Sequence, residues 1–383
     1  MAAEDNKGLL LLLAVCREWR NLIIDSPALW RRLEVSRKTT KKKLDFWMSR
    51  SKGKVSSLII IGIWRKTWIA HVFMWFSKFP DEFWAGLETL EIDSSEDLFL
   101  AMVDAGMFER SRLRNFRFEK DYGGVPRSLN DFTFTTLTSL QIAGDFGEDL
   151  FAMLDRNPSL TWLSLTRRSP RFRDREVNNP KHVELRHLTH LELCGFHDPM
   201  PSLKTSLRIP NLQSLAFRGS WTKPCSPSSC AASVDLSGLP YLRELRLLGC
   251  EPSTDEVKRV LRSTSNITTL ELLQREKIYS YDTASWLESL NPSTTDAFLC
   301  PFLQHIKFSG YRELDLRSLV QFVEGRLQGS SSEGSPEISP SERPRRIMSV
   351  HIENCRYLLH SVKIKWLKAN VPLFTIRRDD TSD

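Results

Sequence analysis

The sequence predicts an α/β fold in which a short helical piece at the N-terminus is followed by a solenoid, or horseshoe, of strand–turn–helix units. An apolar residue followed at +3 and +5 by two more recurs eleven times, and most successive starts lie 23 to 30 residues apart. Prolines precede several of these apolar triplets, as in Asn157-Pro158-Ser159, and amphipathic stretches lie between them. One such unit cannot bury enough apolar surface to offset the ordering of its backbone, so neighbouring units must stack.

Composition narrows the classes of function. The chain has 383 residues, 41% hydrophobic and 26% charged, which is ordinary globular composition. The longest apolar run, residues 9–16, is far shorter than the roughly 20 residues of a membrane span, so we expect no membrane contact. Of 54 basic residues, ten fall within 31–54 beside two acids, which leaves 44 bases against 45 acids elsewhere. Most of the surface is therefore expected to be close to neutral.

The first element covers residues 9–33, LLLLLAVCREWRNLIIDSPALWRRL. Leu12, Cys16, Trp19 and Ile23 follow one another at helical steps, which predicts a buried helix. Ser26-Pro27 suits the cap and first position of a second helix. We expect this helical piece to occupy residues 1–36.

Two signatures in the helical piece resemble the second half of an F-box. Residues 15–20, VCREWR, match the VCRxWR pattern of that family, and Leu29-Trp30 matches its LW pair. The Leu-Pro motif and first helix of a whole F-box have no counterpart in residues 1–8, so we expect either a late-starting gene model or a loss of firm adaptor binding. The resemblance implies that a Skp-type adaptor of an SCF-type cullin-RING ubiquitin ligase is bound by Val15, Cys16, Arg17, Trp19, Arg20, Leu29 and Trp30.

Residues 37–54 are predicted to form a basic linker helix. Leu44, Trp47 and Met48 recur at helical spacing among lysines, so the lysines are expected to form its solvated face. The alternative is that residues 31–54 form a nuclear-import or nucleic-acid-binding patch.

The apolar triplets predict an array over residues 55–355, each with a strand whose +3 and +5 side chains point inward. The spacing of the triplets resembles that of leucine-rich-repeat proteins of the irregular kind. Cys250 and Cys355, with Asp121 and Asp145, fill that family's Asn/Cys position, so we expect a structural role for the two cysteines. The triplets start at Leu58, Leu87, Leu113, Leu137, Leu160, Leu188, Leu212, Leu242, Ile267, Leu303 and Ile347.

Two segments near the C-terminus do not follow the spacing of the triplets. Residues 329–344 are rich in Ser, Pro and Gly and are predicted to be a flexible insertion, in which Ser335 and Ser339 precede prolines. Residues 356–383 are predicted to be a C-terminal cap and tail.

The +2 and +4 residues of each triplet should line the concave face of the solenoid and bind a target protein. Trp162 is prominent among them because large aromatics are frequent at interface hot spots, although a covering loop would remove it from the surface. The residues expected to bind the target are Glu91, Arg117, Gln141, Trp162, His190, Glu192, Glu244, Arg246, Glu271, His305 and Lys307.

We find no motif for catalysis or for a cofactor. Phosphate-binding glycine loops, HExxH and GxSxG are absent from the sequence, so no enzymatic activity and no cofactor are expected. His187, His190, Cys194 and His197 are not expected to hold a metal, because the strand pattern does not make them converge. Seven cysteines without a CxxC pair indicate reduced thiols in the cytoplasm or nucleus.

The expected function is substrate recognition within an SCF-type ubiquitin ligase: F-box-like helices bind the adaptor and the concave face binds a protein destined for degradation. The alternative is a leucine-rich-repeat interaction scaffold without ligase recruitment. A less favoured alternative is nucleic-acid binding through residues 31–54.

Overall fold

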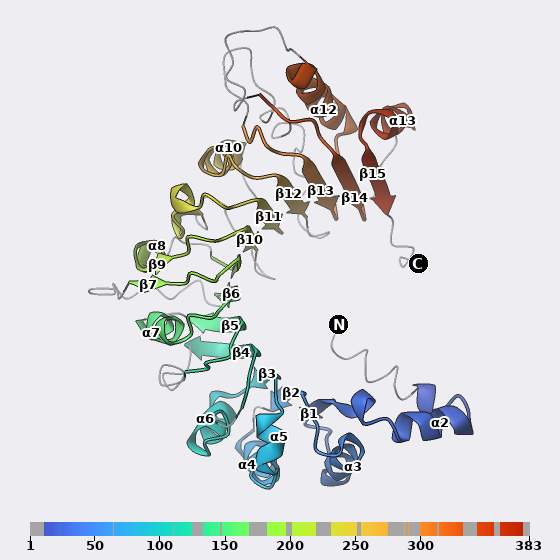
Figure 1. Ribbon diagram of the computed structural model, residues 1–383, viewed down its shortest axis with the longest axis vertical. Coiled ribbons are helices and arrows are strands. Elements are labelled where there is room, and N and C mark those ends of the chain that lie inside the picture. The colour runs from blue at the N-terminus through green and yellow to red at the C-terminus, as the bar shows by residue number, and fades with distance from the viewer. Residues whose placement is uncertain are drawn as a thin grey trace. The chain divides into compact units, whose positions relative to one another are not determined.

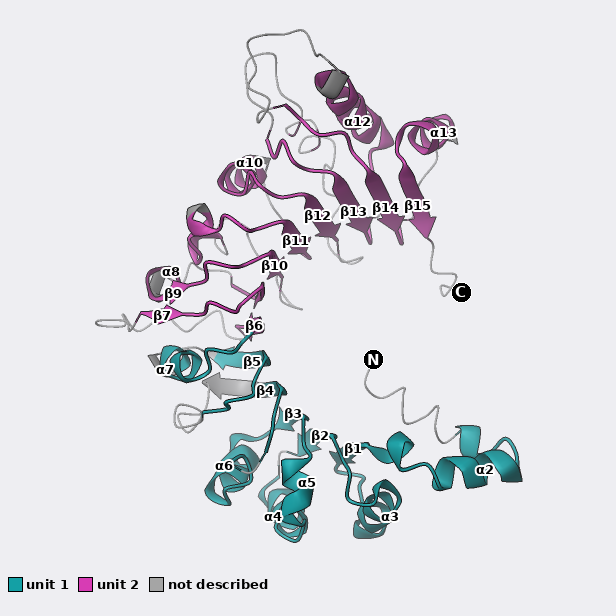
Figure 2. Cartoon of the chain, viewed as in Figure 1, with its two compact units in different colours: residues 1–160 teal, residues 161–383 magenta. Residues whose placement is uncertain are grey.

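The computed structural model of the chain describes residues 11–63, 65–109, 111–124, 133–145, 148–167, 182–196, 201–219, 231–250, 254–274, 287, 290, 299–311, 314–331, 343–355 and 361–377. The chain divides into two compact units, residues 1–160 and 161–383 (Figure 2). Together they hold thirteen parallel strands of one mixed α/β architecture within these ranges, which confirms the predicted α/β class.

Unit 1 contains five described parallel strands that pair in chain order, and Figure 1 shows α3, α4 and α6 on one face of them. The strands are β1 (Arg32–Ser36), β2 (Ser57–Ile63), β3 (Thr89–Ser94), β4 (Asn115–Gly124) and β5 (Ser139–Asp145). The helices are α2 (Arg17–Ile24), the 3-10 turn η1 (Pro27–Trp30), α3 (Lys41–Ser51), α4 (Lys66–Phe76), α5 (Asp81–Ala85), α6 (Glu96–Asp104) and α7 (Glu148–Arg156).

Unit 2 contains eight described strands in parallel register, again paired in chain order, and a separate two-residue pair of β7 (Val183–Glu184) with β9 (Leu207–Arg208). The eight are β6 (Trp162–Thr166), β8 (His190–Cys194), β10 (Ser214–Arg218), β11 (Glu244–Leu248), β12 (Thr269–Leu273), β13 (His305–Ser309), β14 (Ser349–Glu353) and β15 (Leu373–Arg377). The helices are α8 (Pro201–Ser206), η3 (Leu236–Gly238), α10 (Thr254–Ser263), α12 (Leu316–Ser331) and α13 (Ser361–Asn370).

The apolar triplets form the core, as their spacing predicts. In the triplet of β11, for example, Leu242 before the strand and Leu245 and Leu247 within it are all buried, while Glu244 and Arg246 are only partly covered. The helices expected between triplets, α6, α7 and α10, bury apolar residues such as Leu98, and these three expectations are confirmed.

The first predicted triplet, which began at Leu58, has the wrong register. Leu58 pairs with Leu90 and Ile60 with Ile92, so the triplet that matches its neighbours is Val55, Leu58 and Ile60. Val55 is fully buried, as the first member of a triplet should be. The sequence allowed a triplet starting at Leu58 because residues 58–61 are all apolar. Only the pairing with β3 distinguishes that triplet from the one starting at Val55.

The strand array also extends beyond both predicted ends, 55 and 355. Residues 32–36, expected in the helical piece, form β1, whose triplet is Trp30, Leu33 and Val35. Residues 37–54 are consequently not a linker: α3 is the helix between the first two strands, with Leu44 and Trp47 buried and Lys41, Lys42 and Lys43 exposed.

At the other end, the segment expected to be a cap continues the same pattern with α13 and β15. Val371 is buried, and Phe374 and Ile376 occupy the +3 and +5 positions in register with β14. In the predicted insertion 329–344, α12 continues to Ser331, and residues 332–342 with Ser335 and Ser339 lie outside the described residues.

One backbone turn follows most strands of unit 2. The +7 residue of a triplet donates its N–H to the last strand carbonyl of the next triplet, as Gly249 does to Leu273 at 2.6 Å and Gly310 to Glu353 at 2.9 Å. At Gly195, Gly249 and Gly310 this residue has a positive φ, a conformation that favours glycine. The same backbone contact thus holds successive strands of unit 2 in the same register.

Within the described ranges, none of the helices combines the length and the apolar character that crossing a bilayer requires.

Candidate protein-binding surfaces

The polar face of unit 2 consists of the side chains at +2, +4 and +6 of its triplets. Strand register aligns these residues in rows, and the +4 row places Glu192, Ala216, Arg246, Glu271 and Lys307 on consecutive strands. The structure therefore brings the expected target-binding residues of this unit together on one face. Their binding role stays a prediction.

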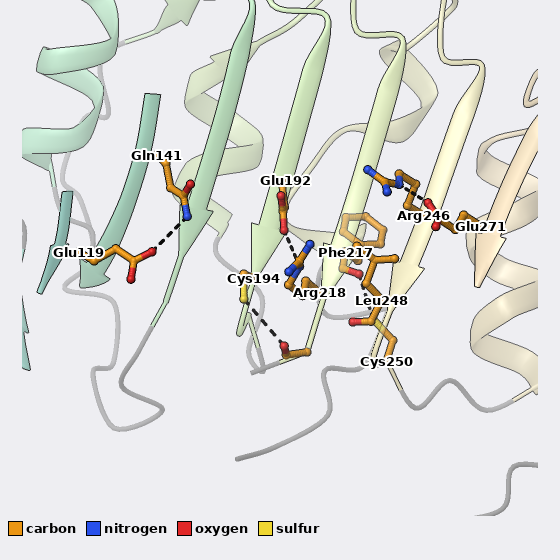
Figure 3. Close-up of polar contacts among 11 residues, drawn as sticks. Glu119, Gln141, Glu192, Cys194, Phe217, Arg218, Arg246, Leu248, Cys250 and Glu271 are labelled. Carbon is orange, nitrogen blue, oxygen red and sulfur yellow. Dashed lines mark hydrogen bonds and ion pairs between the residues drawn. The ribbon is translucent and has the colours of Figure 1, made fainter. Parts of the chain in front are cut away.

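Ion pairs link the polar face across four strands. Arg246 on β11 pairs with Glu271 on β12, and Lys307 Nζ on β13 lies 3.4 Å from Glu271 Oε1 and 2.9 Å from Glu353 Oε2 on β14. A separate pair joins Arg218 Nε to Glu192 Oε1 at 2.6 Å (Figure 3). Positive and negative groups alternate on this face. A binding partner would therefore meet hydrogen-bond donors and acceptors rather than a net charge.

Two members of this network were missed by the sequence reasoning. Arg218 and Glu353 occupy +6 positions, one alternation beyond the +4 residues that were selected. The two-residue period of a strand was a sufficient signal for both, since +2, +4 and +6 share one face.

The ion pairs shift the pKa values of their members. Burial raises the pKa of the Glu271 carboxyl, but the hydrogen bond from Arg246 and the charges of Arg246 and Lys307 outweigh burial and hold it below its usual value. The pKa of Lys307 is raised, first by its hydrogen bond to Glu353. Burial lowers the pKa of Arg246, but its bond to Glu271 and the charges of Glu271, Glu244 and Glu192 together outweigh burial and raise it. All three groups are charged at neutral pH.

We expect Glu271→Gln to lower the free energy of unfolding at pH 7 by about 1–3 kcal/mol, because it leaves Arg246 and Lys307 without their shared carboxylate. The folded-state pKa of Glu271 lies below its unfolded value. Its stabilisation is therefore complete above the unfolded pKa and is lost as pH falls through the folded pKa. The difference in Tm between wild type and variant should shrink below about pH 4.

Glu244→Gln is the matched control. Glu244 Oε1 lies 3.9 Å from Arg246 Nε and the side chain is 36% exposed, so its removal should cost less than about 1 kcal/mol. A Tm difference for Glu271→Gln that stays constant from pH 7 to pH 3.5 would show that the ion pairs do not stabilise the face.

Hydroxyl groups orient three histidines on this face. Nδ1 lies 2.8 Å from Ser349 Oγ in His305, 2.6 Å from Thr375 Oγ1 in His351, and 2.8 Å from Thr189 Oγ1 in His190. All three rings are at least partly exposed, so each is held in place while remaining available to a partner.

Trp162 is half-buried and stands opposite His190 in the register of β6 and β8. It is the one aromatic residue among the expected target-binding residues. Residues 168–181, where a loop covering it would begin, lie outside the described residues.

Unit 1 has a smaller polar face of the same kind. Glu91, Arg117 and Gln141 are aligned on β3, β4 and β5. Arg117 Nη2 lies 2.6 Å from Glu119 Oε1, which also accepts a 3.3 Å hydrogen bond from Gln141 Nε2. Arg117 is exposed, so these contacts position side chains more than they stabilise the fold.

A second candidate is the N-terminal apolar surface, which lies on α2 and the residues flanking it. Here the expectation of a buried helix is wrong, since of the residues in α2 only Ile23 is buried. The surface consists of six side chains that are 40–70% exposed: Leu11, Leu12, Val15, Trp19, Leu22 and Leu29.

The polar residues of the F-box-like signature are also accessible. Arg17 is exposed, and the exposed Arg20 donates a 3.0 Å hydrogen bond from Nε to Leu13 O. Cys16 caps α2, since its Sγ accepts a 3.5 Å bond from the Trp19 N–H. Ser26 does not cap the second helix as expected. Its hydroxyl instead donates to Leu22 O at 2.6 Å, and η1 remains a 3-10 turn.

Trp30 must be withdrawn from the expected adaptor-binding residues. It is 1% exposed, and its ring packs edge-on against Trp47 with centroids 4.8 Å apart. Trp30 Nε1 donates to Ile23 O and Trp47 Nε1 donates to Trp30 O, both at 2.8 Å. Trp30 therefore fixes the end of α2 to the strand array, whereas Leu29 beside it faces outward.

The cysteines at the Asn/Cys position have the surroundings of structural residues. Cys250 Sγ lies 3.3 Å from Phe217 O of the neighbouring strand (Figure 3). Burial raises the pKa of Cys355 to about 11, so this thiol is neutral and unreactive at neutral pH. The side chains of Asp121 and Asp145 lie outside the described residues.

No group of three His, Cys, Asp or Glu side chains in the described part of the chain is placed to hold a metal ion. His187 is exposed and Cys194 is buried, with its Sγ 3.8 Å from Gly219 O, while His197 lies outside the described residues.

Neither the protein-family models nor the curated protein sequences that were compared with the chain gave a match.

Proposed function

We propose that the chain is a non-catalytic substrate-recognition subunit of an SCF-type cullin-RING ubiquitin ligase, acting in the cytoplasm or nucleus. In this proposal the strand array is an irregular leucine-rich-repeat solenoid and α2 with its flanking residues is the F-box-like piece. The N-terminal apolar surface binds a Skp-type adaptor, and the polar faces bind the protein to be ubiquitinated.

The observation that carries the proposal is the exposure of the N-terminal apolar surface. Trp19 and Leu22 are three residues apart on α2 and therefore share a side of the helix, with exposed fractions of 47% and 62%. Clustered apolar side chains of this size usually mark a protein interface. Val15, Trp19 and Leu29 of this surface also belong to the F-box-like signature, which accounts for the partner that we propose.

The array supports the second half of the proposal. Strands with alternating side chains leave the +2, +4 and +6 residues on the polar face, where paired charges and oriented histidines provide directional contacts. Such a surface suits recognition of a folded protein rather than catalysis.

The double variant Trp19→Ala/Leu22→Ala is expected to weaken binding of the purified Skp-type adaptor at least tenfold, because a buried interface tryptophan typically contributes about 2 kcal/mol or more. The measurement is co-purification followed by titration calorimetry. Val362→Ala is the control, since Val362 is 77% exposed on α13 and far along the chain.

Two outcomes would contradict the ligase role. One is equal adaptor binding by wild type and the double variant. The other is no co-purification at all, persisting when an upstream segment with the Leu-Pro helix is added. A scaffold without ligase recruitment would retain its partners on the polar faces, and deletion of the gene would leave their half-lives unchanged.

A further inference from the structure

The proposed function leaves a basic surface of unit 1 without a role. This basic surface consists of eight exposed side chains on α3 and on the connections before β1, between β1 and α3 and after α3: Arg31, Arg37, Lys38, Lys41, Lys42, Lys43, Lys52 and Lys54. The only exposed acid in residues 31–54 is Asp45.

These eight cations are not neutralised by neighbouring carboxylates. Within the described residues, none of the eight side chains takes part in an ion pair. The polar face of unit 2 shows the contrast, because there each Arg and Lys of the network is paired with Glu.

Three of the lysines lie where the fold disfavours them. Lys41, Lys42 and Lys43 form the first turn of α3, which contains no acidic residue and is capped by Thr40 Oγ1. The N-terminus of a helix carries partial positive charge, so cations in the first turn destabilise it. Residues that oppose local stability without compensation in the fold are expected at functional positions.

An aromatic ring lies among these cations. Phe46 is 42% exposed, one turn after Lys42 and Lys43, and the Arg50 guanidinium lies 5.2 Å from its ring centroid. Packing edge-on against Trp30 at 5.5 Å fixes the orientation of the ring. Cations around an accessible aromatic ring can hold phosphates while a base stacks on the ring.

We propose that the basic surface binds single-stranded nucleic acid, with Lys42 and Lys43 contacting phosphates and Phe46 stacking on a base. Membrane binding is less consistent with this helix, because Leu44 and Trp47 on its apolar side are buried within the protein. A duplex provides phosphates but no unstacked base for Phe46. An acidic protein would use the lysines but would not require an aromatic ring.

The test uses the full chain and fluorescein-labelled 20-nucleotide oligo(dT) and oligo(U), followed by fluorescence anisotropy from about 50 to 200 mM NaCl. Lys42→Glu/Lys43→Glu should weaken binding at least tenfold. It should also reduce the slope of log affinity against log salt by about 1.4, since each phosphate contact on a single strand contributes about 0.7. Phe46→Leu, which keeps an apolar contact with Trp30, should weaken binding by about fivefold or more.

The matched control is Lys365→Glu/Lys368→Glu, the same charge change at two exposed lysines of α13. It should alter affinity by less than about twofold, and thermal unfolding of every variant verifies that each is folded. The proposal is overturned by absence of binding at 50 mM salt, by equal effects of the two charge-reversal variants, or by unchanged affinity in Phe46→Leu. Tighter binding of duplex DNA, poly-glutamate or phosphatidylserine vesicles than of either oligonucleotide would also overturn it.

Discussion

Replacing Arg326 by methionine is expected to lower the free energy of unfolding by about 3–5 kcal/mol. Arg326 on α12 is fully buried, and its Nη2 donates to Leu299 O at 2.8 Å and to Cys300 O at 3.0 Å. Nη1 donates to Leu303 O at 3.3 Å and to Pro301 O at 3.5 Å. Methionine fills a similar volume but donates to none of these carbonyls, of which only Cys300 O and Pro301 O keep a described backbone donor, the N–H groups of Leu303 and Arg345. Urea denaturation measures the loss.

The described contacts of the Arg326 guanidinium are these four carbonyls and the ring of Phe322, whose centroid lies 5.1 Å away. Burial lowers its pKa to about 10, and burial raises the pKa of nearby Cys300 to about 12, so at neutral pH the guanidinium is charged and the thiol is not. Arg317→Met, at an exposed position of α12, is the control and should cost less than about 0.5 kcal/mol. Equal midpoints for the two variants would mean that relief from burying a charge compensates for the lost hydrogen bonds.

Gly310→Ala is expected to cost about 2–4 kcal/mol, because two separate penalties add. Gly310 has a φ of +73°, which strains a residue with a Cβ, and that Cβ would overlap the backbone carbonyl of Gln274. Neither can be relieved by a side-chain rotation. In unit 2 this corresponds to a decrease in Tm of about 5–15 °C, which calorimetry would measure.

Gly53→Ala separates the two penalties. Gly53 has nearly the same φ, +71°, but a Cβ there would meet nothing within 4 Å, so about 1 kcal/mol is expected. If Gly310→Ala costs no more than Gly53→Ala, the turn after β13 shifts freely and does not fix the spacing between neighbouring units.

The apolar triplets made the strands predictable because burial of the +3 and +5 side chains follows directly from two-residue alternation. Where the first residue was Leu or Ile, ten of eleven triplets had the register found in the structure. The triplets beginning at Trp30 and Val371 were missed. Trp30 in particular lies in a segment whose three- and four-residue steps also fit a helix, and spacing alone does not separate the two.

Other features depend on contacts between residues distant in the chain. Trp30 matched a surface motif, but only its packing against Trp47 reveals that it is buried. Arg326 has no recognisable pattern around it, because its acceptors at Leu299–Leu303 approach it only after folding. Only part of the ion-pair network was predictable. The two-residue alternation of a strand placed Arg246, Glu271 and Lys307 on one face, but which of them form pairs depends on the register between strands.

Because of the repeated turn after the strands, the register of the sheet does not depend on the number of residues between successive triplets. Gly249 N to Leu273 O spans triplets that start 25 residues apart, and Gly310 N to Glu353 O spans triplets that start 44 apart, yet the backbone contact is the same. Additional residues are accommodated between the end of one turn and the start of the next strand. Insertions and deletions in those connections can therefore accumulate over evolution while the arrangement of side chains on the polar face is preserved.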